Sequence, residues 1–128
     1  MRLLLDTHSL LWWMFDDKTL SRKAEKAIAD DQNEVFVSAA SAWEITTKFR
    51  VGKLPHAAVV ANDVAASIDA EGFKALSVSL AHAQLAGALG GDHRDPFDRM
   101  LIAQAILENM LFVTNEARFD AYPIKRLW

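Results

Sequence analysis

The sequence predicts an α/β protein: a three-layer α/β/α sandwich in which a small parallel sheet lies between two layers of helices. Short, continuously apolar segments such as residues 3–5 have the composition of strands buried on both faces. Segments with helical periodicity separate these strands, which is typical of a parallel sheet built from βαβ units. The 128 residues suffice for one hydrophobic core, so we expect a single domain spanning residues 1–128.

Five segments are expected to form strands. Residues 3–5 should be central, because all three are leucine and the segment ends at Asp6. Lys125-Arg126-Leu127 is expected to be a terminal edge strand. The complete set is residues 3–5, 35–37, 75–78, 111–113 and 125–127.

Six helices are expected between and after these strands. The helix over residues 38–51 contains Ser41-Ala42-Trp43-Glu44, which matches a capping box in which Glu44 bonds back to the Ser41 N–H. Ser21 and Ser79 are suited to cap two other helices. The expected helices are residues 9–15, 22–30, 38–51, 56–70, 80–89 and a last one that begins at Pro96.

The last of these helices carries a carboxylate on its apolar face. Asp95 followed by Pro96 is suited to the N-cap and the first helical position, because proline fixes φ near the helical value. Asp98 then shares a face with Leu101 and Ile102, which is the stripe that a helix turns towards a core. A carboxylate there needs compensation, either from backbone N–H groups at the helix start or from a metal ion.

Composition and charge exclude several classes of protein. Fourteen basic and seventeen acidic residues give a net charge of −3, which argues against non-specific coating of nucleic acid. The chain has no cysteine, so disulfide frameworks and thiolate chemistry are excluded. The apolar runs are too short to span a bilayer, and the chain does not begin with a signal-peptide layout. We therefore expect a cytoplasmic protein without a membrane partner.

Four acids are expected to meet at the carboxyl edge of the sheet. Asp6 and Glu116 follow strands, whereas Glu44 and Asp98 lie near the starts of helices. Taken singly, each has a structural explanation as a turn, cap or dipole residue. Together, carboxylates about 4 Å apart would repel by roughly 4 kcal/mol per pair at an effective dielectric near 20. A bound Mg²⁺ or Mn²⁺ would relieve that repulsion and could activate water for attack on a phosphodiester.

Several motifs resemble one known family. They are Leu4-Leu5-Asp6-Thr7-His8, Ser41-Ala42-Trp43-Glu44-Ile45, the stretch from His93-Arg94-Asp95-Pro96-Phe97-Asp98 to Ala105, and Val113-Thr114 with Phe119 and Tyr122. In this order and spacing, they resemble PIN-domain proteins, and more narrowly the VapC toxins of type II toxin–antitoxin pairs. The resemblance runs essentially from end to end of the chain.

This resemblance implies a metal-dependent endoribonuclease that acts as a toxin. The family's acids fall on Asp6, Glu44 and Asp98, with Mg²⁺ or Mn²⁺ as the cofactor, and its fourth aspartate falls on Glu116. Asp95 could supply a further carboxylate, and Thr7 and Thr114 fall on hydroxyl positions beside the acids. The implied partners are RNA, a VapB-like antitoxin and a second copy in a homodimer, with DNA bound only through the antitoxin.

Several other side chains allow both a structural and a functional interpretation. Lys48 and Arg50 at the end of the Glu44 helix complement the helix dipole or contact RNA phosphates, as could Arg94 and Arg99. Trp12-Trp13-Met14-Phe15 could lie in the core or at a protein interface. His93 is expected to make a local polar contact with Asp95, because the histidines lack metal-ligand spacing.

Two other functions stay open at this point. One is a PIN-like relative with a decayed site that binds RNA or protein without cleavage, for which Glu116 is the hint. The other is a Mg²⁺-binding phosphoacceptor domain, resembling a receiver domain. That function needs an aspartate at the end of a central strand in mid-chain, where this sequence has the helix-like segment Ser41 to Val51.

Overall fold

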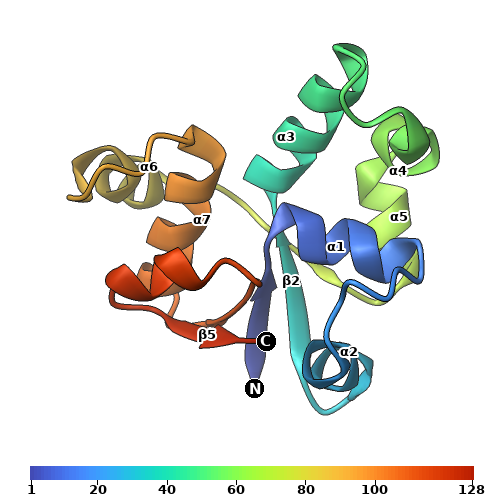
Figure 1. Cartoon of the computed structure of the whole chain (residues 1–128), viewed down its shortest axis with the longest axis horizontal. Coiled ribbons are helices and arrows are strands. Elements are labelled where there is room, and N and C mark those ends of the chain that lie inside the picture. Colours follow the sequence, from blue (N-terminus) through green and yellow to red (C-terminus); the bar gives the residue numbers. More distant parts are fainter.

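The computed structural model describes residues 1–128 and contains one parallel sheet of five strands (Figure 1). The strands are β1 (Arg2–Leu5), β2 (Glu34–Ser38), β3 (Lys74–Leu76), β4 (Leu111–Val113) and β5 (Lys125–Leu127). Their order across the sheet is β3-β2-β1-β4-β5, so β1 is central and β5 is an edge strand, as the sequence predicts. In the register of the sheet, Leu4 lies between Phe36 of β2 and Phe112 of β4.

Helices cover both faces of this sheet, and the predicted α/β/α sandwich is confirmed (Figure 1). The α-helices are α1 (Thr7–Met14), α2 (Arg22–Ala29), α3 (Ala39–Arg50), α4 (Ala58–Asn62), α5 (Val64–Ala70), α6 (Leu80–Ala88) and α7 (Pro96–Leu107). Two 3₁₀ helices, η1 (Pro55–Ala57) and η2 (Ala117–Ala121), complete the set. No helix has the length and apolar composition that crossing a membrane requires.

The central strand divides its side chains between two hydrophobic cores. Leu3 and Leu5 pack into the core shared with α1, α2 and α5, whereas Leu4 packs into the core on the α7 side of the sheet. All three leucines are fully buried. Because successive side chains of a strand point to opposite faces, an uninterrupted leucine run is the composition that such a strand needs.

The expected helix over residues 56–70 is wrong, because the structure divides it into η1, α4 and α5. Asp63 is the break: its backbone is extended (φ −157°), and its side chain accepts the Ala66 N–H at 2.9 Å. An aspartate that satisfies free N–H groups in this way starts a new helix rather than continuing the previous one. The apolar periodicity continues across the break, which is why the pattern alone did not reveal it.

The aromatic run at the end of α1 lies against the core. Trp12 and Trp13 are partly buried and contact Trp128 and Phe73 with ring centroids 5.8 and 6.1 Å apart. Phe15, after the helix, is more exposed and contacts His56 at 5.4 Å. Core packing therefore accounts for most of this run.

Candidate active site

Three neighbouring strands bring acidic residues to the carboxyl edge of the sheet. Asp6 directly follows β1, Glu116 follows β4 after two residues, and Glu44 lies in α3, the helix that continues from β2. Asp98 joins them from the first turn of α7. Carboxyl ends of parallel strands are where open α/β sheets bind ligands, so this edge is the candidate active site.

Asp6 is a buried carboxylate that begins α1. It is only 6 % exposed, and it accepts the Ser9 N–H at 2.7 Å as the N-cap of the helix. The helix therefore begins at Thr7 rather than at Ser9, where the sequence predicted it. Burial raises the pKa of Asp6, and hydrogen bonds from Thr114 and Ser9 only partly offset this effect. The charged form of Asp6 is thus incompletely stabilised by the protein.

Glu44 is buried, and each of its two carboxylate oxygens has a partner. It is 3 % exposed; the Thr7 hydroxyl donates to its Oε1 at 2.6 Å, and the Lys48 ammonium pairs with its Oε2. The Ser41 hydroxyl lies 3.0 Å from the same Thr7 oxygen. The predicted capping box is therefore wrong: Ser38 is the N-cap of α3 and accepts the Ala40 N–H at 3.0 Å. Ser41 and Glu44 lie inside the helix and face the end of β1.

Asp95 and Asp98 have different partners at the start of α7. Asp95 Oδ1 accepts the N–H groups of Phe97 and Asp98 at 2.9 and 3.1 Å, which confirms it as the N-cap. Asp98 Oδ2 lies 2.9 Å from His93 Nε2. The expected contact between His93 and Asp95 is therefore wrong, because the cap already uses Asp95 and leaves Asp98 facing the imidazole.

The charge of Asp98 is only partly compensated. Burial raises its pKa most, and the nearby charges of Asp95 and Glu44 raise it further, while the bond to His93 lowers it. This coupling means that Glu44 of α3 and Asp98 of α7 act on one another across the edge of the sheet.

Glu116 is the outlying acid. Its side chain is 41 % exposed, and its Oε1 lies 3.3 Å from Arg118 Nε. Its backbone N–H donates to Thr114 Oγ1 at 3.1 Å, and its carboxylate does not cap η2. The partner of the Glu116 carboxylate is thus Arg118.

The acids share one edge, yet they do not converge on one point. No group of three histidine, cysteine, aspartate or glutamate side chains lies close enough to hold a metal ion. The chemistry of the donors nevertheless fits a hard divalent cation, because carboxylate and hydroxyl oxygens are the ligands that such ions take. Asp6 and Asp98, whose charges are incompletely stabilised, are the carboxylates with most to gain from a cation.

The four basic side chains that are candidates for contacting RNA differ in whether they already have partners in the protein. Arg99 donates from Nε to the Ala86 carbonyl at 2.9 Å, and its two terminal nitrogens bond to the carbonyls of His93 and Leu89. Lys48 is paired with Glu44. Arg50 and Arg94 are exposed and have no hydrogen bond or ion pair to the protein. Arg99 thus holds the loop before α7, whereas Arg50 and Arg94 remain open to a ligand.

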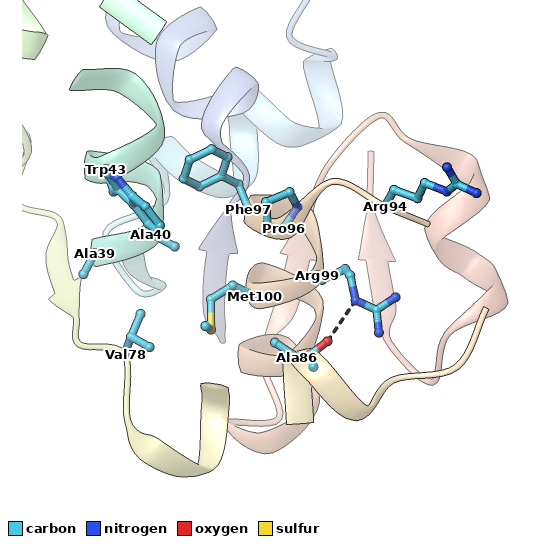
Figure 2. Close-up of a pocket in the computed structure, with 11 residues that line it drawn as sticks. Ala39, Ala40, Trp43, Val78, Ala86, Arg94, Pro96, Phe97, Arg99 and Met100 are labelled. Carbon is cyan, nitrogen blue, oxygen red and sulfur yellow. Dashed lines mark hydrogen bonds between the residues drawn. The ribbon is translucent and has the colours of Figure 1, made fainter. Parts of the chain in front are cut away.

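A pocket of about 470 Å³ lies between α3, α6 and α7. Figure 2 shows the rings of Trp43 and Phe97 side by side at its upper end, and the centroids lie 5.0 Å apart in an edge-to-face arrangement. Trp43 and Phe97 directly precede Glu44 and Asp98 in the sequence, but neither acid lines the pocket. Arg94 lies at the far side of the view with its guanidinium turned away from the pocket (Figure 2).

Three polar side chains of the site were not expected from the sequence. Ser9 donates its hydroxyl to the Val113 carbonyl at 3.0 Å and its N–H to Asp6; Ser41 lies against Thr7; and His93 contacts Asp98. The bond from the Ser9 hydroxyl to Val113 and the contact of Ser41 with Thr7 join segments far apart in the chain, whereas the other two contacts are local. Closeness in the sequence could have signalled the partners of the Ser9 N–H and of His93.

Fold and acidic edge together define an α/β protein whose candidate site lies at the carboxyl ends of parallel strands. The family model for the PIN domain matches residues 3–125, and the chain belongs to the PIN-domain family. PIN domains are generally nucleases, so nuclease activity is the activity that this membership supports. The phosphoacceptor alternative is wrong: the mid-chain strand β3 lies at the sheet edge and is followed by Ser77 rather than an aspartate.

Solved structures share this fold at low sequence identity. The structure of VapBC2 from Rickettsia felis, bound to a DNA fragment from its promoter, matches with a TM-score of 0.69 and 16 % identity over 100 % of both chains. VapBC-1 from nontypeable Haemophilus influenzae gives 0.64 and 14 %, covering 98 % of this chain and 96 % of the other. A toxin–antitoxin complex from Klebsiella pneumoniae gives 0.60 and 18 %, covering 94 % and 92 %. No curated protein matches the sequence.

Proposed function

We propose that this chain is a metal-dependent endoribonuclease and the toxin of a toxin–antitoxin pair. The observation that carries the proposal is the gathering of acids at the carboxyl edge of a PIN domain: Asp6 follows β1, Glu44 lies in α3, and Asp98 lies in the first turn of α7. A protein keeps incompletely compensated acids at one edge when their charge is used there, since they otherwise weaken the fold.

Asp6 and Asp98 would hold a Mg²⁺ or Mn²⁺ ion, with Glu44 and Glu116 as further candidates for the site. Bound there, the ion would supply Lewis-acid polarisation of a phosphate oxygen and a more acidic water. The protein's own part is to fix the two aspartates: Ser9 and Thr114 hold Asp6, and His93 holds Asp98. Thr7 keeps Glu44 in place from the neighbouring helix. Asp95 serves mainly as the cap of α7.

RNA is the proposed substrate, and exposed arginines are suited to its phosphates. Arg94 follows His93 in the loop that leads to Asp98, and Arg50 ends α3, the helix that carries Glu44. Both side chains are exposed and free of protein partners, so either could contact phosphates on the two sides of the acidic edge. Lys48 and Arg99 have partners within the protein and are weaker candidates.

The proposed partners follow the structures that share the fold. VapBC2 is a complex bound to promoter DNA, and the Klebsiella pneumoniae structure is a toxin–antitoxin complex. We infer that this chain, as a single PIN domain, binds a VapB-like antitoxin, forms a homodimer and acts in the cytoplasm. A net charge of −3 supports DNA contact through the antitoxin rather than through this chain.

Sequencing of RNA ends after induced expression tests this function. Wild-type protein should generate new 5′ ends at defined positions, and Asp98→Asn should generate none at equal protein level. Equal sets of ends from both proteins would contradict the proposed role of Asp98.

A PIN domain that binds RNA without cutting it is the second candidate. The acids do not converge on one point, and Glu116 pairs with Arg118, and both observations favour a decayed site. Binding of RNA by the wild type without any new ends would support this alternative and exclude the nuclease.

A further inference from the structure

A polar groove lies between the loop that precedes α7 and the segment that contains η2. Residues 89–95 line one wall, and Arg118 with residues 121–123 lines the other. The volume of about 740 Å³ is within the range of sites that hold a ligand. Only three of the eleven lining residues are hydrophobic, so the groove is suited to a polar ligand.

Each wall of this groove contributes a residue that contacts an acid of the candidate active site. On the first wall, His93 Nε2 lies 2.9 Å from Asp98 Oδ2. On the second wall, Arg118 Nε lies 3.3 Å from Glu116 Oε1. The groove therefore adjoins the acidic edge between the start of α7 and the segment that follows β4.

Each wall also carries an arginine with donors left for a ligand. Arg94 is exposed and has no partner in the protein, and its guanidinium turns away from the pocket between α3, α6 and α7 (Figure 2). The side chain of Arg118 is 63 % exposed; its ion pair uses Nε, which leaves the two terminal nitrogens. Guanidinium groups are suited to phosphate oxygens, because their planar N–H donors can bond two oxygens at once.

A contact between the two walls fixes the shape of the groove. The Tyr122 hydroxyl donates to the Gly90 carbonyl at 3.2 Å. Gly91 has a φ of +81°, and a Cβ at this position would lie only 2.8 Å from the same hydroxyl oxygen. Glycine thus allows the loop to approach Tyr122 closely. A groove whose walls are already held together loses less conformational entropy when a ligand binds.

Two aspartates in the groove oppose an anionic ligand. Asp95 uses Oδ1 to accept two N–H groups at the start of α7, where the helix dipole offsets its charge. Asp92 is exposed and has no partner in the protein. Since two arginines face two aspartates, the groove has no broad positive field, and an anion would be held by direct contacts with the arginines.

We propose that this groove binds the backbone of a single RNA strand, with Arg94 and Arg118 each contacting a phosphate. A groove lined by cations is how proteins follow the backbone of a single strand, whereas recognition of duplex RNA spreads over successive minor grooves. The inference rests on the RNA substrate proposed above. It adds the path of the strand, which leaves the acidic edge between Asp98 and Glu116.

Binding of RNA without cleavage tests this path. Fluorescence anisotropy is measured in EDTA with a labelled single-stranded RNA of about twelve nucleotides, and thermal melting checks the folding of each variant. Arg94→Gln combined with Arg118→Gln should bind at least about tenfold more weakly at low salt, because two charged hydrogen-bond donors are lost. The slope of log K against log salt should decrease by about 1.4, since each phosphate contact on a single strand contributes about 0.7.

The matched control combines Arg22→Gln with Lys23→Gln. These exposed side chains of α2 lie outside the groove, and their removal changes the net charge by the same amount. The control should bind RNA within about twofold of wild type, because salt screens charges far from the ligand. Equal affinities of the two double variants would overturn the proposal, since net charge alone would then explain any loss.

Two further variants test the walls separately. Removal of Arg118 also frees the charge of Glu116, so Arg118→Gln is added to Glu116→Gln; it should weaken binding by a further threefold or so. No further loss would exclude Arg118 from the groove's phosphate contacts. Asp92→Asn should strengthen binding by about twofold, because it removes a charge that repels phosphate. Weaker binding by Asp92→Asn would contradict an anionic ligand.

The sequencing of RNA ends separates this inference from the proposed function. Cleavage by the wild type, together with equal RNA affinities of the two double variants, would overturn the groove and leave the nuclease standing. Binding that depends on Arg94 and Arg118 without any cleavage would support the groove and refute the nuclease. RNA that the wild type neither binds nor cuts would refute both.

Discussion

Arg99 ties the loop between α6 and α7 to the start of α7, and its removal should weaken the whole fold. Its guanidinium donates to the carbonyls of Ala86, Leu89 and His93. The first two are orphan carbonyls at the end of α6, and the third precedes the cap of α7 by two residues. A hydrogen bond from a charged donor contributes about 1.5–3 kcal/mol, but water recovers part of this at half-buried carbonyls. We therefore expect Arg99→Met to lower the free energy of unfolding by about 2–4 kcal/mol.

Urea unfolding followed by circular dichroism measures this loss. Arg94→Met is the matched control, since Arg94 is exposed and has no partner in the protein, and it should change stability by less than about 0.5 kcal/mol. A loss of less than about 0.5 kcal/mol in Arg99→Met would refute the reasoning, because it would mean that the three carbonyls are equally well served by water.

Three other substitutions test the site without metal. In EDTA, Asp98→Asn should raise the melting temperature at neutral pH. The pKa of Asp98 in the folded protein lies above its ordinary value of 3.8, so at neutral pH the charged carboxylate makes the fold less stable than a neutral side chain would. The difference should disappear in more acidic solution, where the wild-type carboxyl is also neutral; a variant less stable at neutral pH would contradict this sign. Thr7→Val should cost about 1–3 kcal/mol in urea unfolding, because it leaves one oxygen of the buried Glu44 unpaired. Ser38→Ala should cost about 1 kcal/mol as the loss of the N-cap of α3, and an unchanged stability would show that this cap is dispensable.

Features that depend on neighbouring residues were predictable from the sequence. The leucine run of β1 predicted a central buried strand, and Asp95-Pro96 predicted the start of α7, because composition and capping are local. The order of the elements followed from the same signals. The placement of Asp6 and Asp98 at one edge followed from the parallel sheet.

Other features were not predictable, either because distant residues decide them or because the local signal allowed two outcomes. The Ser41–Glu44 capping box failed because Glu44 pairs with Thr7, which lies 37 residues away, and with Lys48. Asp63 divides the expected helix over residues 56–70 within an unbroken apolar pattern. The convergence of four acids could not be derived either: Glu116 pairs with Arg118, a contact that only the geometry of the loop after β4 reveals.

Cleavage of RNA by the purified protein tests the central claim most directly. A labelled single-stranded RNA is incubated with wild type, Asp6→Asn and Asp98→Asn, each with Mg²⁺, with Mn²⁺ and with EDTA. The account predicts cleavage by the wild type only when a divalent ion is present, and a loss of at least about 100-fold in both variants, as expected when a metal ligand is removed. Cleavage that persists in EDTA or in Asp98→Asn would contradict the assignment of this site.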